Sequence, residues 1–288
     1  MKFVLSTSFS SVSHLTALAP VADETGWEAM SFSDHVVHPR NISTPYPYTD
    51  DGSRRWPAFT DWPDPWVVIG ALAAITTRLR FTNNIFVLPM RNPFLVAKAI
   101  ATAAVISGNR VTPAFGVGWS EDEFTLMQQD FRSRGKRMDE MLEIMQRLWS
   151  GDWVDYSGEH YQFAELEMNP PPPGPIPVWI GGISDAAMKR AARAADGWVT
   201  DLQTSAEIIT CIEKISDWRA DYGRDGPFEI MATPSDAWDI DGYRRLQDAG
   251  VTHILTMPWA FYHGETDDLE LKIDGLRRFA DDVVAKMA

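Results

Sequence analysis

The sequence predicts an α/β protein: a single (β/α)8 TIM barrel that spans residues 1–288 as one domain, with insertion loops at the C-terminal face. The length of 288 residues is usual for one such barrel. Strand-like and helical patterns alternate almost from end to end, which indicates a parallel sheet covered by helices. Runs such as residues 177–180 and 254–257 are nearly continuously apolar, as expected for strands buried on both faces.

Eight strand–helix units follow one another, which is the number that closes a barrel. The predicted strands are residues 2–8, 27–33, 79–88, 110–117, 178–182, 197–201, 228–233 and 251–257. The predicted helices are residues 14–25, 65–77, 93–107, 121–149, 185–195, 206–222, 240–249 and 269–286. Gly26 ends the first helix, Pro93 opens the third, and Gly135 interrupts the fourth. A doubly wound open sheet is the alternative that the same alternation allows.

Two segments interrupt this pattern. Residues 151–175 predict a hairpin-bearing excursion that ends in a run of prolines. Residues 39–63 are rich in Pro, Tyr and Asp, and include the aromatic residues Tyr46, Tyr48, Trp56 and Trp62. Because a long loop after the second strand lies on the catalytic face of a barrel, this segment is predicted to be a lid or a wall of the substrate site.

The bulk composition disfavours several classes of binding partner. The net charge of −14 disfavours binding to nucleic acid or to anionic membrane surfaces, and no stretch approaches the ~20 apolar residues of a membrane span. The one cysteine, Cys211, cannot form an internal disulfide, and the N-terminus lacks the apolar region of a signal peptide. We therefore expect a cytoplasmic protein that acts on a small-molecule substrate.

The active site of a barrel lies in the loops that follow its strands. Asp34 and His35 follow the second strand, where a carboxylate and an imidazole can transfer a proton or hydrogen-bond a ring cofactor. The alternative is a structural aspartate beside a partly exposed histidine. The spacing of His35 and His38 would also suit a metal site. Because the only further histidine near a strand end is His253, inside the last strand, no metal is predicted.

Three further strand ends carry unusual residues. Asn83 and Asn84 stand inside an apolar strand, which indicates a special site or a β-bulge. Gly118 and Trp119 follow the fourth strand, where a glycine lets the backbone approach a ligand. After the fifth strand, the glycines Gly181 and Gly182 precede a serine-capped helix, which predicts either a phosphate cradle or a tight turn.

In this order and spacing, the motifs resemble the luciferase-like monooxygenase superfamily of bacteria, especially its F420-dependent oxidoreductase branch. The stretches that carry the resemblance include SDH at 33–35, LPMRNP at 88–93, GVGW at 116–119, RGKRMDE at 134–140, YSGEHY at 156–161, PVWIGG at 177–182 and DGW at 196–198. The likeness covers nearly the whole chain.

The resemblance implies a flavin-like ring at the carboxyl ends of the strands. Asp34 and His35 would border the ring, with His35 as the proton donor or acceptor. The peptide between Asn84 and Ile85 would be a cis bond forming a bulge behind the ring. The remaining contacts implied are Gly118, Trp119, Gly181 and Gly182 along the ribityl-phosphate path, with Glu121 as an acidic catalytic residue, for which Glu123 fits as well. A homodimer is also implied.

The predicted function is an F420-dependent oxidoreductase that transfers a hydride between the deazaflavin C5 and a small organic substrate. One alternative is an FMN-dependent two-component flavin monooxygenase on the same scaffold, which would need a flavin reductase partner. A second is a non-catalytic flavin- or deazaflavin-binding protein. A metal hydrolase is the most distant alternative.

Overall fold

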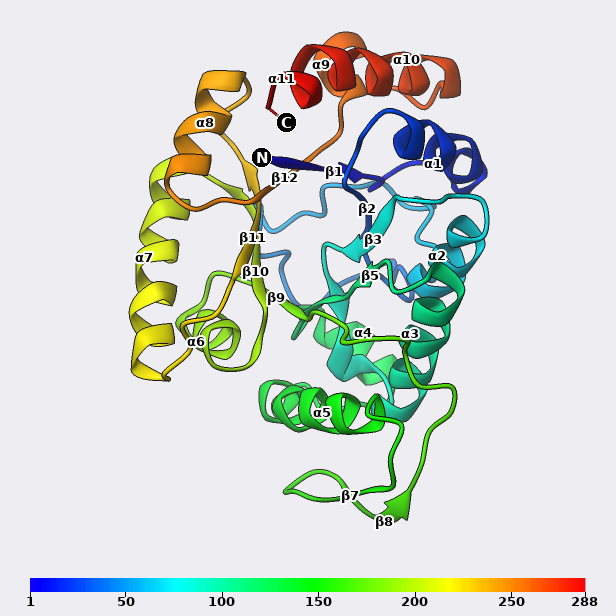
Figure 1. Ribbon diagram of the computed structural model, residues 1–288, viewed down its shortest axis with the longest axis vertical. Coiled ribbons are helices and arrows are strands. Elements are labelled where there is room, and N and C mark those ends of the chain that lie inside the picture. The colour runs from blue at the N-terminus through cyan, green and yellow to red at the C-terminus, as the bar shows by residue number, and fades with distance from the viewer. Residues whose placement is uncertain (288) are drawn as a thin grey trace.

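The computed structural model describes residues 1–287, and its centre is one curled parallel sheet (Figure 1). The strand segments of this sheet are β1 (Lys2–Ser6), β2 (Ala29–Phe32), β3 (Arg80–Asn83), β4 (Phe86–Val87), β5 (Val111–Thr112), β6 (Ala114–Gly116), β9 (Trp179–Gly181), β10 (Gly197–Gln203), β11 (Glu229–Pro234) and β12 (His253–Thr256). Their order across the sheet is β4-β6-β9-β10-β11-β12-β1-β2-β3-β5. The predicted α/β class with a parallel sheet is confirmed.

Helices surround the sheet on its outer side (Figure 1). They are α1 (Leu15–Glu24), α2 (Pro65–Ala73), α3 (Pro93–Ser107), α4 (Glu121–Leu126), α5 (Arg134–Leu148), α6 (Asp185–Ala194), α7 (Ser205–Asp221), α8 (Ile240–Asp248), α9 (Trp259–His263), α10 (Leu269–Phe279) and α11 (Ala285–Met287). The remaining helical segments are short: the 3₁₀ turns η1 (Val12–His14) and η2 (Leu88–Met90), and the π-helical segment η3 (Ala280–Val284). None of the helices described between residues 1 and 287 combines the length and apolarity that crossing a membrane requires.

Side chains of alternate residues face opposite sides of the sheet and form two apolar layers. Val4 is aligned with Ala29 of β2 and, on its other side, with Leu255 of β12. These three residues belong to a small inner cluster, whereas the neighbours Phe3 and Leu5 join the large core between sheet and helices. The inner cluster consists of Val4, Ala29, Ala114, Trp179, Val199, Met231 and Leu255, with Ile85 packed on it.

Two predicted strands are each divided in two. Residues 79–88 form β3 and β4, which are separated by Asn84 and Ile85, and residues 110–117 include β5 and β6, which are separated by Pro113. Proline has no backbone N–H and so cannot donate to the ladder. The two divided strands are still neighbours along their length, because β3 pairs with β5 and β4 pairs with β6.

The other differences from the sequence prediction concern helix ends and one insertion. The predicted helix 121–149 is two helices, α4 and α5, and the predicted helix 269–286 is continued by η3 and α11. Nothing in the sequence pattern predicted α9. The excursion at 151–175 contains the expected antiparallel hairpin, formed by β7 (Val154–Ser157) and β8 (Gln162–Leu166), which projects from one end of the molecule in Figure 1.

Candidate active site

His35 follows the carboxyl end of β2 and is paired with a buried carboxylate. Its Nδ1 lies 2.9 Å from Oε2 of Glu123, whose side chain is only 3% exposed in the first turn of α4. The other oxygen, Oε1, accepts a hydrogen bond from the Val36 backbone N–H at 3.0 Å. Because an ionised carboxylate can only accept, His35 Nδ1 is the donor, and a neutral His35 therefore has its lone pair on Nε2.

Glu123 is held in its charged form. Burial by itself raises the pKa of this carboxyl, but the hydrogen bond and charge of His35, together with the backbone N–H groups of Val36 and Val37, bring the pKa below its ordinary value. An ionised Glu123 stabilises positive charge on the His35 ring. Within residues 1–287 only Nδ1 of His35 has a hydrogen-bond partner, so Nε2 is available to a bound molecule.

Asp34 is engaged in a two-point ion pair. Its side chain is 1% exposed, and Oδ1 and Oδ2 each lie 2.7 Å from a terminal nitrogen of Arg91. Oδ2 also accepts the backbone N–H of Val87 at 2.9 Å. Burial raises the pKa of Asp34, and the Arg91 guanidinium and the Val87 N–H oppose that rise. This pairing joins the end of β2 to the end of β4, next to His35.

The peptide bond between Asn84 and Ile85 is cis, as the family resemblance implied. The Ser33 hydroxyl donates to the Asn84 carbonyl at 3.0 Å and lies 2.8 Å from the Ser8 hydroxyl. The Asn84 backbone N–H donates to the Phe32 carbonyl at 3.0 Å. The bulge is therefore tied to β2 and to the segment that follows β1.

The Ile85 side chain turns into the sheet and lies against two glycines. A Cβ atom built on Gly116 would collide with Ile85 Cδ1, and one built on Gly181 would collide with Ile85 Cγ2. The glycines at these two strand ends are therefore required by the bulge itself. Gly116 was not among the predicted site residues, because the glycine pattern alone does not identify what approaches it.

Gly118 and Gly182 have backbone conformations that favour glycine. Their φ angles are +79° and +118°. A Cβ atom on Gly118 would collide with the side chains of Val87 and Phe124, and the carbonyl of Gly182 accepts the indole N–H of Trp198 at 2.8 Å. Both glycines thus shape turns at strand ends, and the turn at Gly182 leads directly into α6.

The turn before α6 is capped as the sequence predicted. The Ser184 hydroxyl accepts the Ala187 backbone N–H at 3.3 Å. The other N–H groups of a first helical turn have no partner within the helix. This start of α6, with Gly181 and Gly182 before it, remains the place where the sequence predicts phosphate binding.

The loop 39–63 lies over His35. The ring centroids of Trp56 and Trp62 are 4.7 Å and 5.0 Å from the His35 ring, and that of Trp119 is 6.1 Å away. The sequence predicted this loop to be a lid or a wall, and the structure brings its aromatic residues to the predicted proton-transfer residue.

Three contacts anchor the loop 39–63 around the site. The Asp61 carboxylate accepts the Val12 N–H at 2.9 Å. The Ser43 N–H donates to Asp122 of α4 at 2.8 Å. Arg55 pairs with Asp201 of β10 at 2.9 Å. The loop is therefore attached to the segments that follow β1 and β6 and to the strand β10 itself.

Of the two acidic candidates, the structure brings Glu123 and not Glu121 to His35. Glu121 is exposed at the first position of α4. Its neighbour Glu123, two residues later, points to the opposite side and is buried. The sequence left this choice open, because both residues lie within one helical turn. Arg91, the partner of Asp34, was not predicted as a site residue, although it stands in the LPMRNP stretch.

The histidines considered for a metal site are not together. His38 Nε2 lies 2.9 Å from Arg54, and burial and the Arg54 charge lower the pKa of His38. His253 is aligned with Lys2 at the amino end of β1, whereas His35 follows the carboxyl end of β2, so the two histidines lie at opposite ends of the strands. Among residues 1–287, no group of three or more His, Cys, Asp or Glu side chains is arranged to hold a metal ion.

Two buried hydroxyls face the inside of the sheet below the bulge. Ser31 and Thr82 are paired in register, and Ser31 lies on the same face as Ala29 of the inner cluster. Both hydroxyl oxygens are buried without a partner among the described residues. A buried polar group normally has a hydrogen-bond partner. These two hydroxyls could therefore hydrogen-bond a polar atom of a bound ligand or a water molecule.

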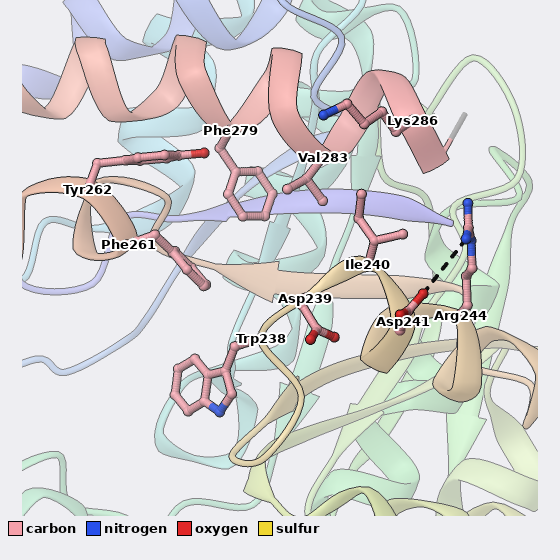
Figure 2. A pocket seen from close by; sticks show the side chains of 10 residues that line it. All are labelled: Trp238, Asp239, Ile240, Asp241, Arg244, Phe261, Tyr262, Phe279, Val283 and Lys286. Atoms are coloured by element: carbon pink, nitrogen blue, oxygen red, sulfur yellow. Dashed lines mark ion pairs between the residues drawn. The ribbon is translucent and has the colours of Figure 1, made fainter.

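A groove of about 710 Å³ lies elsewhere, on the outer surface between α8 and the helices α9 to α11 (Figure 2). It is open to solvent, and Trp238 and Phe261 stand at its side together with both acidic and basic residues. Asp241 and Arg244 in this groove pair with each other at 3.8 Å. None of the site residues predicted from the sequence lines it.

The chain matches the family model described as luciferase-like monooxygenase over residues 3–262. An uncharacterized protein of Mycobacterium tuberculosis is 37% identical over the full length of both chains. An F420-dependent glucose-6-phosphate dehydrogenase of Nakamurella multipartita is 26% identical, over 96% of this chain and 77% of that protein.

Solved structures give the same fold with two kinds of cofactor. An F420-dependent secondary alcohol dehydrogenase in complex with an F420-acetone adduct has a TM-score of 0.77 at 17% identity and covers 99% of this chain and 98% of its own. A type II Baeyer-Villiger monooxygenase of Pseudomonas putida in complex with FMN has a TM-score of 0.63 at 16% identity, over 98% of this chain and 84% of its own. The match over residues 3–262 and the full-length relative at 37% identity show that this chain belongs to the luciferase-like monooxygenase family.

Proposed function

We propose that this protein is an F420-dependent oxidoreductase that transfers a hydride between the deazaflavin C5 and a small organic substrate. The observation that carries the proposal is the pairing of His35 with the buried, ionised Glu123 at a strand end beneath an aromatic loop. Relatives named F420-dependent glucose-6-phosphate dehydrogenase support the choice of cofactor.

The fold proposed for this function is a (β/α)8 barrel formed by the chain as one domain. Counting β3 with β4, and β5 with β6, as single interrupted strands leaves eight strands in the sheet. In such a barrel the residues after each strand converge at one face. His35, Gly118 and Gly182 follow strands in this way, and the Asn84–Ile85 bulge lies between β3 and β4.

The residues at this face fit a flavin-like group. The buried hydroxyls of Ser31 and Thr82 lack partners below the bulge, and the free Nε2 of His35 lies at the same edge of the sheet. Asp34, Asn84, Ile85, Gly118 and Trp119 would surround the ring and its side chain, and Gly181 and Gly182 would hold the phosphate at the start of α6. When bound, the deazaflavin supplies the hydride chemistry.

The protein side chains then manage the proton and the geometry. His35 Nε2 accepts the proton that a substrate hydroxyl loses on oxidation, or donates it on reduction. Glu123 holds the ring by Nδ1 and stabilises its positive charge. The Asp34–Arg91 pair fixes the turn on which His35 stands, and the aromatic residues of the loop 39–63 exclude water. Glu121 is retained as a second acidic candidate for contact with substrate.

An FMN-dependent two-component monooxygenase is the alternative, supported by the family description and by the FMN-bound structural neighbour. It would require a flavin reductase that supplies reduced FMN. A non-catalytic flavin- or deazaflavin-binding protein is a further alternative, and the hydrogen bond of His35 to the buried Glu123 disfavours it because storage needs no group that transfers protons.

The experiment follows the visible absorbance of F420 and of its reduced form with a panel of small alcohols, aldehydes and ketones. We expect substrate-dependent change of F420 absorbance that falls by about 10²-fold or more in His35→Ala. Oxygen consumption with reduced FMN, and no reaction with F420, would favour the monooxygenase. Equal F420 turnover by His35→Ala would remove His35 from the mechanism.

We also propose that the protein is a homodimer. The outer sides of α2 and α3 expose apolar side chains, among them Val67 at 73% and Leu95 at 72%. Exposed apolar patches often mark protein–protein contacts. Sedimentation velocity at micromolar concentration should give the mass of two chains, and a single chain at that concentration would contradict the proposal.

A further inference from the structure

The aromatic residues above His35 form one connected group, called here the aromatic cluster: Phe9, Tyr46, Tyr48, Trp56, Trp62 and Trp119. Tyr46 joins its parts, because its ring centroid is 5.1 Å from Trp119 and 5.2 Å from Trp56. Trp62 is 5.2 Å from Trp56, and Phe9 is 5.7 Å from Trp62. The cluster therefore presents a continuous apolar surface to the ring of His35.

One buried polar atom of this surface has no hydrogen-bond partner among residues 1–287. The indole N–H of Trp62 is buried and finds no acceptor within residues 1–287, although the Trp62 ring lies 5.0 Å from His35. A buried N–H without an acceptor destabilises the site until an acceptor arrives. An oxygen atom of a bound molecule would satisfy this N–H beside the free Nε2 of His35.

The positive charges next to the cluster are already engaged. Arg55 donates to Asp201 at 2.9 Å and to the Tyr46 hydroxyl at 3.0 Å. Arg91 is bound at two points to Asp34. Moving Arg91 to an anionic ligand would leave the buried Asp34 carboxylate without its partner, which is costly. Moving Arg55 would break its ion pair with the partly exposed Asp201. The site is therefore poorly suited to a phosphorylated substrate.

We propose that the aromatic cluster selects an uncharged substrate with a flat, apolar body and one hydroxyl or carbonyl oxygen, which accepts the Trp62 N–H. The inference rests on the proposed function and adds its substrate class, an aromatic or alicyclic alcohol and its ketone. In oxidation the bound deazaflavin would take the hydrogen on the alcohol carbon as hydride, and His35 would accept the hydroxyl proton; reduction would reverse both transfers. The substrate stacks on the cluster through its flat face.

This substrate class differs from that in the name of the Nakamurella multipartita relative, which specifies glucose 6-phosphate. A dianionic sugar phosphate needs cations or a helix start to hold it, whereas a flat neutral molecule needs aromatic faces and few polar contacts. The cluster supplies the second kind of surface, and five of its six members are Tyr or Trp.

The test uses two flat aromatic ketones, acetophenone and its anionic para-carboxylate derivative 4-acetylbenzoate, with glucose 6-phosphate as the third ligand. Binding to the purified full chain is measured by calorimetry, with and without saturating F420. We expect acetophenone to bind at least about tenfold more tightly than 4-acetylbenzoate, and glucose 6-phosphate not to compete. Equal or reversed preference, or no binding of acetophenone, would overturn the inference.

Two variants separate stacking from the hydrogen bond. Trp62→Phe keeps an aromatic ring and removes the N–H, so affinity for acetophenone should fall about fivefold while that for ethylbenzene, which has no oxygen, stays unchanged. Trp56→Ala should weaken both ligands. Trp153→Phe is the control, because Trp153 is 70% exposed just before the hairpin strand β7. Equal loss of both ligands in Trp62→Phe would remove the hydrogen bond from the account.

The affinity of F420 is measured separately for each variant. If F420 does not bind to the wild-type protein, the proposed function fails, and the preference between acetophenone and 4-acetylbenzoate is decided on the cofactor-free chain. If Trp62→Phe lowers F420 affinity but leaves acetophenone affinity unchanged, the cluster serves the cofactor, and the proposed substrate class is wrong.

Discussion

Glu123 Oε2 accepts a hydrogen bond from His35 Nδ1 at 2.9 Å, across 88 positions of the sequence. The same carboxylate accepts the backbone N–H of Val36, so one buried acidic group fixes both the ring and the turn that carries it. A carboxylate that orients an acid–base histidine in this way sets the tautomer of the ring and stabilises its charged form. The chemistry proposed for His35 therefore depends on Glu123.

Glu123→Gln should lower turnover by about 10²-fold, because an amide can donate to Nδ1 and so favour the wrong tautomer of His35. It should also change the response of stability to acid. The folded pKa of Glu123 is depressed, so its stabilisation is present above its ordinary pKa and is lost as pH falls through the folded value. The difference in urea unfolding free energy between wild type and Glu123→Gln should shrink below about pH 4.5. A constant difference from pH 7 to pH 3 would contradict this.

Removing one partner of the Asp34–Arg91 pair should cost about 3 kcal/mol or more of unfolding free energy, because Asp34 is 1% exposed and would be left buried and unpaired. Arg91→Ala and Asp34→Asn combined should cost less than the sum of the two. The control is Arg278→Ala, whose partner Asp274 is 3.7 Å away with both side chains about half exposed, and it should cost less than about 1 kcal/mol. Strict additivity at the first pair would contradict the account.

Gly116→Ala should destabilise the protein by about 1–3 kcal/mol, because the new Cβ atom collides with Cδ1 of Ile85. Valine has no Cδ1 atom, so Ile85→Val should rescue much of this loss. Gly181→Ala is the matched control: its Cβ atom collides with Cγ2, which valine keeps, and Ile85→Val should not rescue it. Thermal unfolding of the two glycine variants, of each combined with Ile85→Val, and of Ile85→Val alone decides the point, and equal rescue at both glycines would contradict the packing described.

The loop 39–63 should be released by Asp201→Asn, because Arg55 then loses its ionic partner. Trypsin cuts after arginine, and Arg54 and Arg55 are both held by hydrogen bonds in the loop. We expect cleavage at these residues to become several-fold faster in Asp201→Asn, since proteolysis follows local opening. Glu159→Gln, which removes the exposed pair with Lys136, is the control and should leave the rate unchanged.

The alternation of strands and helices was enough to predict the parallel sheet, because periodicity depends on which faces are buried. It was not enough to predict the divisions of the strands 79–88 and 110–117, which arise where Ile85 turns inward and where Pro113 interrupts the ladder. The short helix α9 was missed because five residues are too few for a periodic pattern.

Part of the candidate site could be proposed from the sequence. The strand ends pointed to Asp34 and His35, whose role stays a prediction, and the family resemblance implied the cis bond between Asn84 and Ile85, which the structure contains. The sequence could not predict which side chains pair with each other. Glu123 and Arg91 contact their partners across 88 and 57 positions, and neither residue type nor spacing indicates such contacts. The aromatic loop was predicted to be a lid or a wall, but only the three-dimensional structure shows that Trp56 and Trp62 lie against His35.

The most direct test of the proposed function is fluorescence-monitored titration of the purified protein with F420 and, separately, with FMN. The account predicts tight binding of F420 and much weaker binding of FMN, with F420 affinity reduced in Gly182→Ala, where φ is +118°. Tight binding of FMN together with no binding of F420 would contradict the central claim and move the function to a two-component monooxygenase.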